Sequence, residues 1–570
     1  SSTQGRRRIA DDVCIIGAGI LGSVLAYSLA QSGRSVLLLE RDLSEPDRIV
    51  GELLQPGGVL ALQKLGIDDT VEGIDAVPCE GYQVFWGDQV VAIPYPEETK
   101  TMRWSDGTDR KQEGRSFHHG LFIQNLRRKA QSAQGVALVE ATVNELLEDE
   151  AGTIVGVKAT PRKASADDDA SEPLHYRAKL TIVADGCMSK FRRALLPSHI
   201  VPTTRSHFVG LVLEDADLPA PHHGHVILGK ADPAHPPAPT AEGVPSLGPV
   251  LVYQLATHDT RMLVDVRGPK LPPQAQLAAW LREHVTPVLP PTVVASFHAA
   301  LDKSLTKDKQ HRLRSMPNSY LPPYPQGRDT QGAFLAGDSL NMRHPLTGGG
   351  MTVAFNDCVL LTELLGGGKA VSDVQGDERG PVELDNWLDV SERLEEWHWK
   401  RKAVASCINV LSLALYSLFG ADGASSLLSL GVSLPLRTSL THRSRDENLE
   451  VLKTGCFKYF ELGGDCIQGP VGLLSACVPS LSLVRLLRRL ERSLTSLSQV
   501  HPSPARLFYH FFRVAFYSIY CLFTLPILAA GPDGGKPGLK QYPALTVKSF
   551  KVFWTACVVL LPVLWSEGQM

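Results

Sequence analysis

An acidic residue precedes a glycine triplet in the stretch FLAGDSLNMRHPLTGGGMTVAFND, which covers residues 334–357. Asp338 follows a short apolar run typical of a strand, and Gly348 to Gly350 stand where a helix is expected to begin. A carboxylate can accept hydrogen bonds from hydroxyl groups, and the N-terminus of a helix attracts negative charge. We therefore predict that an anionic ligand with hydroxyl groups lies across this junction. The alternative is a glycine turn that caps a helix beside an unrelated aspartate.

A second glycine cluster lies near the start of the chain, in DDVCIIGAGILGSVLAYSLAQSGRSVLLLERD (11–42). An apolar run predicts a buried parallel strand, and Gly17, Gly19 and Gly22 follow it with the spacing GxGxxG. In dinucleotide-binding proteins these glycines allow a tight turn, the approach of a pyrophosphate and close packing of helix on strand. The next strand ends in Glu40, where an acid binds the adenosine ribose. This unit predicts FAD or NAD in preference to NADP.

The remaining motifs favour a flavin. The stretch LTIVADGCMSKFRRAL (180–195) repeats the pattern of a strand followed by a loop, with Asp185 and Arg192. Asp338 is expected to bind the ribityl hydroxyls, and the helix after the glycine triplet is expected to face the N1/O2 edge, which is negative in a reduced flavin. NAD has no ribityl chain, so the pieces together predict FAD. Because the sequence holds no second GxGxxG, electrons must come from transient contact with NAD(P)H or from a partner protein.

These three pieces, GxGxxG…E, ADG…R and GD…GGG, resemble the FAD-dependent monooxygenases of the aromatic-hydroxylase fold. The resemblance implies an α/β fold in which a Rossmann-type FAD-binding domain is interleaved with a β-sheet substrate domain, before a C-terminal helical membrane-associated region. The FAD-binding segments are expected at 1–80, 126–205 and 326–390, and the substrate segments at 81–125 and 206–325. A helical region at 391–500 is expected to close the substrate tunnel, and a membrane-associated hairpin is expected at 501–570.

Longer stretches resemble the squalene epoxidase (squalene monooxygenase) family. They are ERDLSEPDRIVGELLQPGG (40–58), GYQV (81–84), IPYP (93–96), GRSFHHG (114–120) and YFELGGDCIQGPVGLLS (459–475), together with the GD…GGG stretch. The resemblance implies epoxidation of squalene by O₂ to (S)-2,3-oxidosqualene through a flavin C4a-hydroperoxide, as a step of sterol biosynthesis. It also implies that NADPH supplies electrons through a partner NADPH–cytochrome reductase. The implied location is the endoplasmic reticulum membrane, with the catalytic part facing the cytosol, or lipid droplets.

The family resemblance also implies individual roles. The expected FAD-binding residues are Gly17, Gly19, Ile20, Leu21, Gly22, Glu40, Arg41, Arg48, Leu53, Arg127, Val143, Asp338 and Met351. Tyr82 and Gln55 are expected to hydrogen-bond near the flavin and shape the catalytic site, with Tyr82 gating it rather than acting as an acid. The residues expected to line a dry tunnel for the substrate are Ile93, Leu228, Tyr253, Pro345, Leu346, Phe419, Phe460 and Leu473. On sequence alone, Arg127 is better interpreted as a solvated helix charge, and each apolar residue as ordinary core.

The composition of the 570 residues argues against some other classes of protein. The formal net charge of −3 gives no reason to expect nucleic acid as a partner. Ten cysteines show no metal-ligand spacing, so no metal site is expected. The chain starts without methionine and without a signal-peptide pattern, which leaves open whether a further N-terminal stretch precedes it.

Two apolar runs near the C-terminus, VAFYSIYCLFTLPILAA (514–530) and VFWTACVVLLPVLW (552–565), are shorter than the roughly 20 residues that a spanning helix needs. A Gly/Pro-rich turn (531–538) joins them, so a hairpin that dips into one leaflet is the preferred interpretation. A spanning pair and a buried core hairpin are the alternatives. Just upstream, LSLVRLLRRLERSL (481–494) has the spacing of a helix on an anionic membrane surface or of an exposed soluble helix.

Three other functions fit part of the pattern. A flavin hydroxylase with an aromatic substrate would need a polar pocket, often with an activating base. A geranylgeranyl-reductase-like flavoenzyme would reduce the double bonds of a lipid. A lipid-binding escort of the GDI type would share the fold without using FAD, and the intact GD…GGG stretch argues against it.

Overall fold

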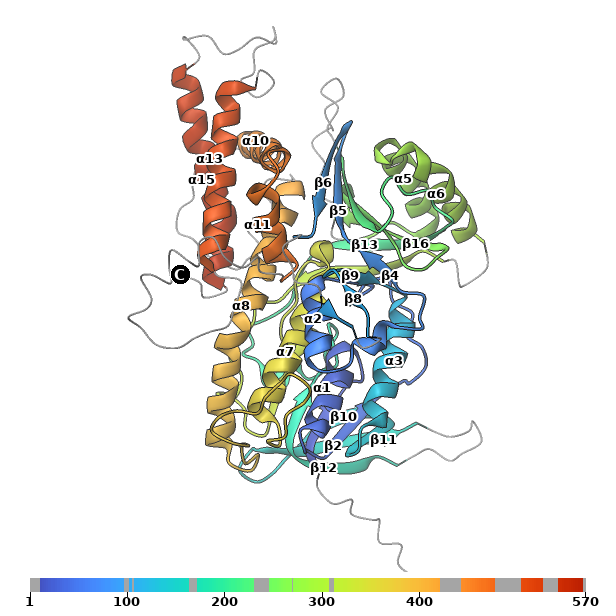
Figure 1. Cartoon of the computed structure of the whole chain (residues 1–570), viewed down its shortest axis with the longest axis vertical. Helices are drawn as coiled ribbons and strands as arrows, with labels where there is room; N and C mark the ends of the chain where they lie inside the picture. Colours follow the sequence, from blue (N-terminus) through green and yellow to red (C-terminus); the bar gives the residue numbers. More distant parts are fainter. Residues whose placement is uncertain are drawn as a thin grey trace, which may run out of the picture.

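The computed structural model describes residues 11–96, 102–104, 107–162, 172–229, 245–268, 270–306, 312–420, 442–476, 504–525 and 542–566. Two large sheets and a set of C-terminal helices form the body of the molecule (Figure 1). The expected fold class is confirmed, because a mostly parallel sheet carries the glycine motifs and segments of a second sheet are interleaved with it along the chain. The domain boundaries given above stay predictions.

The first sheet carries the three cofactor motifs. Its strands are β1 (Asp11–Ile16), β2 (Val36–Glu40), β10 (Val136–Glu148), β11 (Ile154–Pro161), β12 (Leu174–Val183) and β18 (Ala333–Leu335). β1 lies between β2 and β12, β10 extends the sheet beside β2, and β18 extends it beside β12, all in parallel. The carboxyl ends of parallel strands meet at one edge of a sheet. The loops after β1, β12 and β18 therefore come together there.

Helices cover this sheet and begin at the motifs. α1 (Ile20–Gln31) follows the first glycine turn and lies between α3 (His119–Ser132) and α7 (Gly350–Leu365). α7 has Gly349 as its N-cap, so the helix expected after the glycine triplet is confirmed. The long α8 (Trp387–Gly420) packs along α7 (Figure 1).

The second sheet has seven strands and two different faces. In spatial order they are β17 (Arg314–Tyr320), β13 (Thr203–Glu214), β16 (Asp259–Arg267), β15 (Ser246–Gln254), β14 (His223–Leu228), β5 (Gly81–Trp86) and β6 (Gln89–Pro94). Successive residues of a strand point to opposite faces. On β15, Val250 and Val252 pack under α5 (Gln274–Val285) and α6 (Pro291–Ser304), whereas Leu251 and Tyr253 face the cofactor side. The sequence alternation thus separates a structural face from a face that can build a site.

Short elements lie in the connections between the longer strands and helices. They are β3 (Leu53–Leu54), β9 (Gly114–Ser116) and β4 (Val77–Cys79), which form a small sheet, β7 (Met102–Arg103) and β8 (Asp109–Arg110), α2 (Pro56–Lys64), α4 (Arg192–Leu195), and the 3₁₀ turns η1 (Asp68–Val71), η2 (Thr286–Val288), η4 (Gly337–Ser339) and η5 (Pro345–Thr347).

The C-terminal helices stand beside the β5–β6 edge of the second sheet (Figure 1). They are α10 (His442–Glu461), α11 (Asp465–Leu474), α13 (Pro504–Thr524) and α15 (Tyr542–Ser566). α13 and α15 cover most of the two predicted apolar runs and lie side by side. The turn expected between them (531–538) and the stretch 481–494 lie outside the described residues.

Among the described residues, one helix is long and apolar enough to cross a membrane. It is Trp387–Phe419, with 33 residues and a mean hydropathy of 1.5, and 56% of its apolar window is buried inside the protein. This helix lies in the region that the sequence assigned to closing the tunnel, not in the predicted hairpin. Length and apolar composition are shared by core helices of soluble proteins, so this property alone is weak evidence for a span.

Candidate active site

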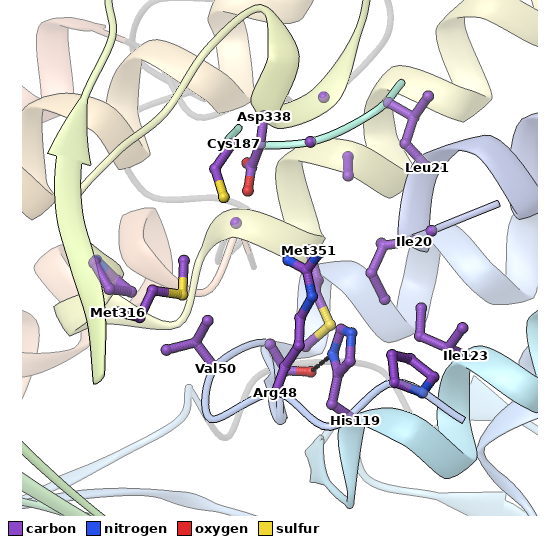
Figure 2. A pocket seen from close by; sticks show the side chains of 18 of the residues that line it. Ile20, Leu21, Arg48, Val50, His119, Ile123, Cys187, Met316, Asp338 and Met351 are labelled. Atoms are coloured by element: carbon purple, nitrogen blue, oxygen red, sulfur yellow. Dashed lines mark hydrogen bonds between the residues drawn. The ribbon is translucent and has the colours of Figure 1, made fainter. Parts of the chain in front are cut away.

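A cavity of about 610 Å³ lies where the three glycine motifs meet. Figure 2 shows Asp338 and Cys187 on one side of it, with Arg48, His119 and Met351 facing them. Twelve of the thirteen residues expected to bind the cofactor line the cavity: Gly17, Gly19, Ile20, Leu21, Glu40, Arg41, Arg48, Leu53, Arg127, Val143, Asp338 and Met351. The structure therefore brings together residues from five separate stretches of sequence.

The first glycine turn is packed too tightly for side chains at two positions. A Cβ atom on Gly17 would lie 2.6 Å from the Ala184 carbonyl oxygen, and one on Gly22 would lie 1.9 Å from the Gly17 carbonyl oxygen. Gly22 is the expected cofactor residue that does not line the cavity, because its role is to let α1 pack against the turn. Gly19 has open space around its missing Cβ, on the cavity side, as a backbone approached by a pyrophosphate requires.

Arg127 holds the first glycine turn in place through hydrogen bonds to backbone carbonyls. Its side chain is 5% exposed, its Nε donates to the Ala18 carbonyl at 2.9 Å, and its Nη1 donates to the Ser44 carbonyl at 3.0 Å. The interpretation of Arg127 as a solvated helix charge is therefore wrong. Glu40 accepts a hydrogen bond from the Ala18 amide at 2.8 Å and lies 3.7 Å from Arg127, so the acid and the cation are fixed on the same turn.

Arg192 joins the second and third motifs. Its guanidinium donates to the carbonyls of Ser339 at 2.8 Å, Asp338 at 3.0 Å and Cys187 at 3.0 Å. These bonds use the backbone of Asp338 and leave its exposed carboxylate directed into the cavity (Figure 2). The carboxylate is therefore positioned to bind hydroxyl groups of a ligand.

The glycine triplet lies at the N-terminus of α7, which forms another part of the cavity wall. Gly348 has φ +61°, in the left-handed region, and a Cβ on Gly349 would lie 2.4 Å from the Ile408 Cγ2 atom of α8. Gly350 has no atom near its missing Cβ and lines the cavity. The helix N-terminus is thus open to a ligand.

His119 lines the cavity, and no role was predicted for it from the sequence, although it lies in the stretch GRSFHHG. Its Nδ1 donates to the Gly51 carbonyl at 2.9 Å. Burial, with smaller contributions from Arg48 and Arg127, lowers the pKa of His119 to about 4. The imidazole is therefore neutral near pH 7, and the positive charge that faces the cavity comes from arginines such as Arg48 and Arg127.

Gln55 and Tyr82 form one buried hydrogen-bonded group. The Gln55 Nε2 atom donates to the Thr347 carbonyl at 2.9 Å and to the Tyr82 hydroxyl. The Tyr95 hydroxyl donates to Gln55 Oε1 at 2.7 Å, a contact that the sequence did not indicate. Of these side chains, Tyr82 reaches the cavity. Burial raises the pKa of both tyrosines above the ordinary value, so both hydroxyls stay protonated.

The residues expected to line the substrate tunnel fall mainly in one buried group, which we call the apolar cluster. Its members include Ile93, Leu228, Tyr253, Leu346 and Phe460, together with Tyr82, Tyr95, Phe208, Tyr416 and Phe457. Phe419 is half-buried and packs against it, and Pro345 lines the cavity. Leu473 belongs to a separate small group with Tyr320 and Val410, so the structure does not bring it into the apolar cluster.

A buried ion pair ties the cavity wall to the second sheet. Glu52, 1% exposed, accepts two hydrogen bonds of 2.7 Å from Arg261 on β16, and the Tyr253 hydroxyl donates to it at 3.2 Å. Glu52 and Tyr253 both line the cavity. Glu52 stands within the quoted 40–58 stretch, but nothing in the sequence pairs it with an arginine 209 positions away.

Comparison with known proteins decides the family. A model of the squalene epoxidase family matches residues 177–430, 438–490 and 488–530, and a model of FAD-dependent oxidoreductases matches residues 12–46. The squalene epoxidase of Schizosaccharomyces pombe is 38% identical over 98% of both chains. Squalene epoxidase 1 of Arabidopsis thaliana is 40% identical over 89% of this chain and 77% of its own. The chain belongs to the squalene epoxidase family.

Solved structures support the fold of this squalene epoxidase family member. A probable FAD-dependent monooxygenase from Pseudomonas aeruginosa matches 72% of this chain and 97% of its own, with a TM-score of 0.52 and 17% identity. The flavin-dependent brominase Bmp2 matches 85% and 99%, with a TM-score of 0.52 and 13% identity. At these identities the likeness shows the fold alone.

The predicted cofactor, FAD, is confirmed by the match of residues 12–46 to the model of FAD-dependent oxidoreductases, and the cavity fits it. The glycine turn leaves room for a pyrophosphate at Gly19, the Glu40 carboxylate stands at the end of β2, and the free carboxylate of Asp338 lies across the cavity. Two carboxylates on either side of a turn that suits a diphosphate can accept hydrogen bonds from the ribose and from the ribityl chain of one dinucleotide.

Proposed function

We propose that this protein epoxidises squalene with O₂, placing one oxygen atom in the substrate to form 2,3-oxidosqualene while the other leaves as water. The observation that carries the proposal is that the cofactor cavity shares a wall with the apolar cluster, through Tyr82, Tyr253 and Leu346. An isolated alkene has no group to deprotonate, and it dissolves in apolar surroundings. A site that sets an apolar cluster directly against a flavin cavity suits such a substrate.

The chain's own residues hold the cofactor and exclude water. We assign the diphosphate to the turn at Gly17 to Leu21 with Arg48 near it, the adenosine ribose to Glu40, and the ribityl chain to Asp338. Bound FAD, when reduced, supplies the activation of O₂. The protein supplies orientation and a dry environment, which favour transfer of oxygen to the substrate over side reactions with water.

Tyr82 and Gln55 lie where the cofactor cavity meets the apolar cluster. Both tyrosines of the hydrogen-bonded group are neutral, and Gln55 carries no charge, so this group cannot act as a base near pH 7. We assign it to shaping and gating the passage between the apolar cluster and the cavity. Ile93, Leu228, Tyr253, Leu346 and Phe460 would then hold the terminal double bond and exclude water.

The test is a single turnover. The purified protein is reduced anaerobically and then mixed with air-saturated buffer and squalene in detergent, and the product mass is measured. An increase of one oxygen atom, with the epoxide at a terminal double bond, supports the proposal. Saturation of a double bond would instead indicate a lipid reductase, and oxidation of the flavin without any change in squalene would contradict the proposal.

We also propose that NADPH delivers electrons through a separate membrane-bound NADPH–cytochrome reductase, since one complete dinucleotide fingerprint is present in the sequence and FAD occupies it. Stopped-flow absorbance at the flavin band should show slow reduction by NADPH alone and fast reduction after the reductase is added. Rapid bleaching without the reductase would reveal a direct nicotinamide site.

We propose that the protein is located at the endoplasmic reticulum membrane, and the exposed surface of the C-terminal helices supports association with a membrane. On α13 and α15, Phe516 is 60% exposed and Phe550 is 72% exposed, and Tyr520 and Trp554 are also exposed. Aromatic side chains on an outer surface suit the boundary between lipid and water. Removal of residues 507–570 should reduce sedimentation with microsomes, and full sedimentation of the shortened protein would place the main anchor elsewhere, with α8 as the next candidate.

A further inference from the structure

We propose that Tyr95 is a positioning residue that acts through Gln55 to hold the Tyr82 hydroxyl in place at the cavity. This inference rests on the proposed function and deepens it, because it adds a residue that does not itself line the cavity. Tyr95 directly follows β6 and is buried, and its hydroxyl donates to Gln55 Oε1 at 2.7 Å.

The direction of each hydrogen bond follows from the chemistry of the partners. The Thr347 carbonyl can only accept, so the Gln55 amide nitrogen must face it, at 2.9 Å. The amide oxygen of Gln55 then faces Tyr95, and because that oxygen can only accept, Tyr95 must donate. The second hydrogen of the Gln55 nitrogen goes to the Tyr82 oxygen. Tyr82 is thereby made an acceptor of the Gln55 bond.

The consequence concerns the hydrogen of Tyr82. Since Gln55 occupies a lone pair of the Tyr82 oxygen, the hydroxyl hydrogen is directed elsewhere. The Thr347 carbonyl lies 3.5 Å from the Tyr82 oxygen, and the Tyr95 hydroxyl also lies close to it. A contact of 3.5 Å is weak. The hydrogen of Tyr82 thus remains available to a group in the cavity that Tyr82 lines.

Gln55 and Tyr82 are closely packed, so a shift of the Gln55 side chain should also move its neighbours. A Cβ on Gly348 would lie 3.1 Å from Gln55 Nε2, and a Cβ on Gly224 would lie 2.8 Å from the Tyr82 ring. The rings of Tyr82 and Tyr95 meet edge to face, with centroids 6.1 Å apart. Because Gln55 is fully buried and its amide contacts both Tyr82 and Thr347, loss of the Tyr95 hydrogen bond is expected to change the position of Tyr82 and of the turn before α7.

Two other side chains, Cys79 and Tyr82, lie close to the Tyr95 hydroxyl, but its single hydrogen goes to Gln55 Oε1 at 2.7 Å. The Cys79 Sγ atom lies 3.9 Å from the Tyr95 oxygen, and sulfur is a poor acceptor. Burial holds the pKa of Tyr95 well above its ordinary value, so it does not become a tyrosinate that would accept a hydrogen bond from Gln55. Donation to Gln55 is therefore the principal hydrogen bond of Tyr95.

The test is a double-mutant cycle in single turnovers of the FAD-loaded protein reduced with dithionite and mixed with O₂ and squalene. Tyr95→Phe should lower the rate of epoxide formation about five- to tenfold, as expected for the loss of one buried hydrogen bond. It should also raise the share of oxidised flavin whose electrons appear as H₂O₂ instead of epoxide. The affinity for FAD, measured by titration of the apoprotein, should change less than about twofold, because Tyr95 does not reach the cavity.

The cycle is completed in the Gln55→Leu background. If Tyr95 acts through Gln55, Tyr95→Phe should cause no further loss of rate and no further rise in H₂O₂ there. Losses that simply multiply would overturn the inference, as would an equal loss of FAD affinity in Tyr95→Phe. Gln55→Glu sharpens the test, because the new side chain matches the amide in size but places an oxygen against the Thr347 carbonyl. It should lower the rate of epoxide formation and raise the share of H₂O₂ as much as Gln55→Leu does.

Tyr27→Phe is the matched control, since it removes a hydroxyl from α1 outside this group, and its rate and H₂O₂ share should equal those of the unchanged protein. The failures of the two proposals are distinguishable. A wild-type protein that forms no epoxide contradicts the proposed function, whereas an active wild type with an additive cycle contradicts the role of Tyr95 alone.

Discussion

The cofactor cavity and the apolar cluster meet at Tyr82, Tyr253 and Leu346, yet their residues come together in different ways. Three acidic groups of the cavity, Glu40, Asp185 and Asp338, lie at the ends of strands β2, β12 and β18 or within three residues of them, so the element that precedes each one positions it. The residues of the apolar cluster lie within strands and helices, and only the pairing of the second sheet and the packing of α10 and α11 against β6 bring them together.

The cavity and the apolar cluster are also stabilised by different interactions. Hydrogen bonds and ion pairs at the cavity wall are directional, and a buried charge that loses its partner is strongly destabilising. Packing in the apolar cluster is non-directional and depends on the volume that is filled. The cavity should therefore be sensitive to the identity of single polar atoms, whereas the cluster should be sensitive to side-chain size. Four substitutions test this distinction, in order of decreasing effect.

Glu52→Ala should have the largest effect. It leaves the Arg261 guanidinium, which is almost completely buried, without the carboxylate that accepts two of its hydrogen bonds. Removing one partner of a buried pair costs about 3–5 kcal/mol. Urea denaturation of the FAD-loaded protein measures the change in unfolding free energy. The combined change of Glu52→Leu with Arg261→Met should recover most of the loss, and a double variant as unstable as Glu52→Ala would show that the buried charge is not the cause.

Phe460→Ala tests the apolar side. Phe460 is buried on α10, and truncation of such a ring removes packing and leaves a cavity, at a cost of about 3 kcal/mol. The KM for squalene should rise while the dissociation constant of FAD stays unchanged, because Phe460 does not line the cofactor cavity. Phe460→Leu, which keeps most of the volume, is the control and should retain most of the squalene affinity. A parallel loss of FAD binding would show that the two regions are not separate.

Asp338→Ala tests the cofactor cavity, where FAD binding and not squalene binding should be lost. Its carboxylate is exposed to the cavity, and charge-assisted hydrogen bonds are worth about 1.5–3 kcal/mol, so FAD affinity should fall about tenfold or more. The stability of the apoprotein should change little, since Arg192 binds the backbone of this residue and not its side chain. Unchanged FAD affinity in a titration of the apoprotein would refute the ribityl assignment.

The same distinction explains how much could be predicted from the sequence. Glycine turns, strand ends and the helix after Gly348 to Gly350 are local patterns. The fold class and twelve of the thirteen expected cofactor residues, which line the cavity, follow from these patterns and the family resemblance. Glu52 with Arg261 and Gln55 with Tyr95 are contacts between segments that lie 209 and 40 positions apart, and a single sequence does not reveal which distant segments pack together. Leu473 was grouped with the tunnel because it stands in a matching stretch, but α11 turns it toward Val410 instead.

Tyr253→Phe should have the smallest effect, and it is the most discriminating test because Tyr253 belongs to both regions. Its ring packs in the apolar cluster, and its hydroxyl donates to Glu52. Phenylalanine keeps the ring and removes the hydroxyl, so the apolar side should be unaffected and the KM for squalene should change less than about twofold. Glu52 keeps both hydrogen bonds from Arg261, and the 3.2 Å bond from Tyr253 is the longest of the three, so the loss of stability should be about 1 kcal/mol.

Tyr253→Ala is the companion variant, and it should raise the KM for squalene as well as lower the stability, since it removes the ring. The ratio of the two squalene effects then separates the contributions of ring and hydroxyl. If Tyr253→Phe raised the KM as much as Tyr253→Ala, the hydroxyl would have to act on the substrate side. In that case the boundary between the two regions would not run between the ring of Tyr253 and its oxygen, and the ion pair of Glu52 would be part of the substrate passage itself.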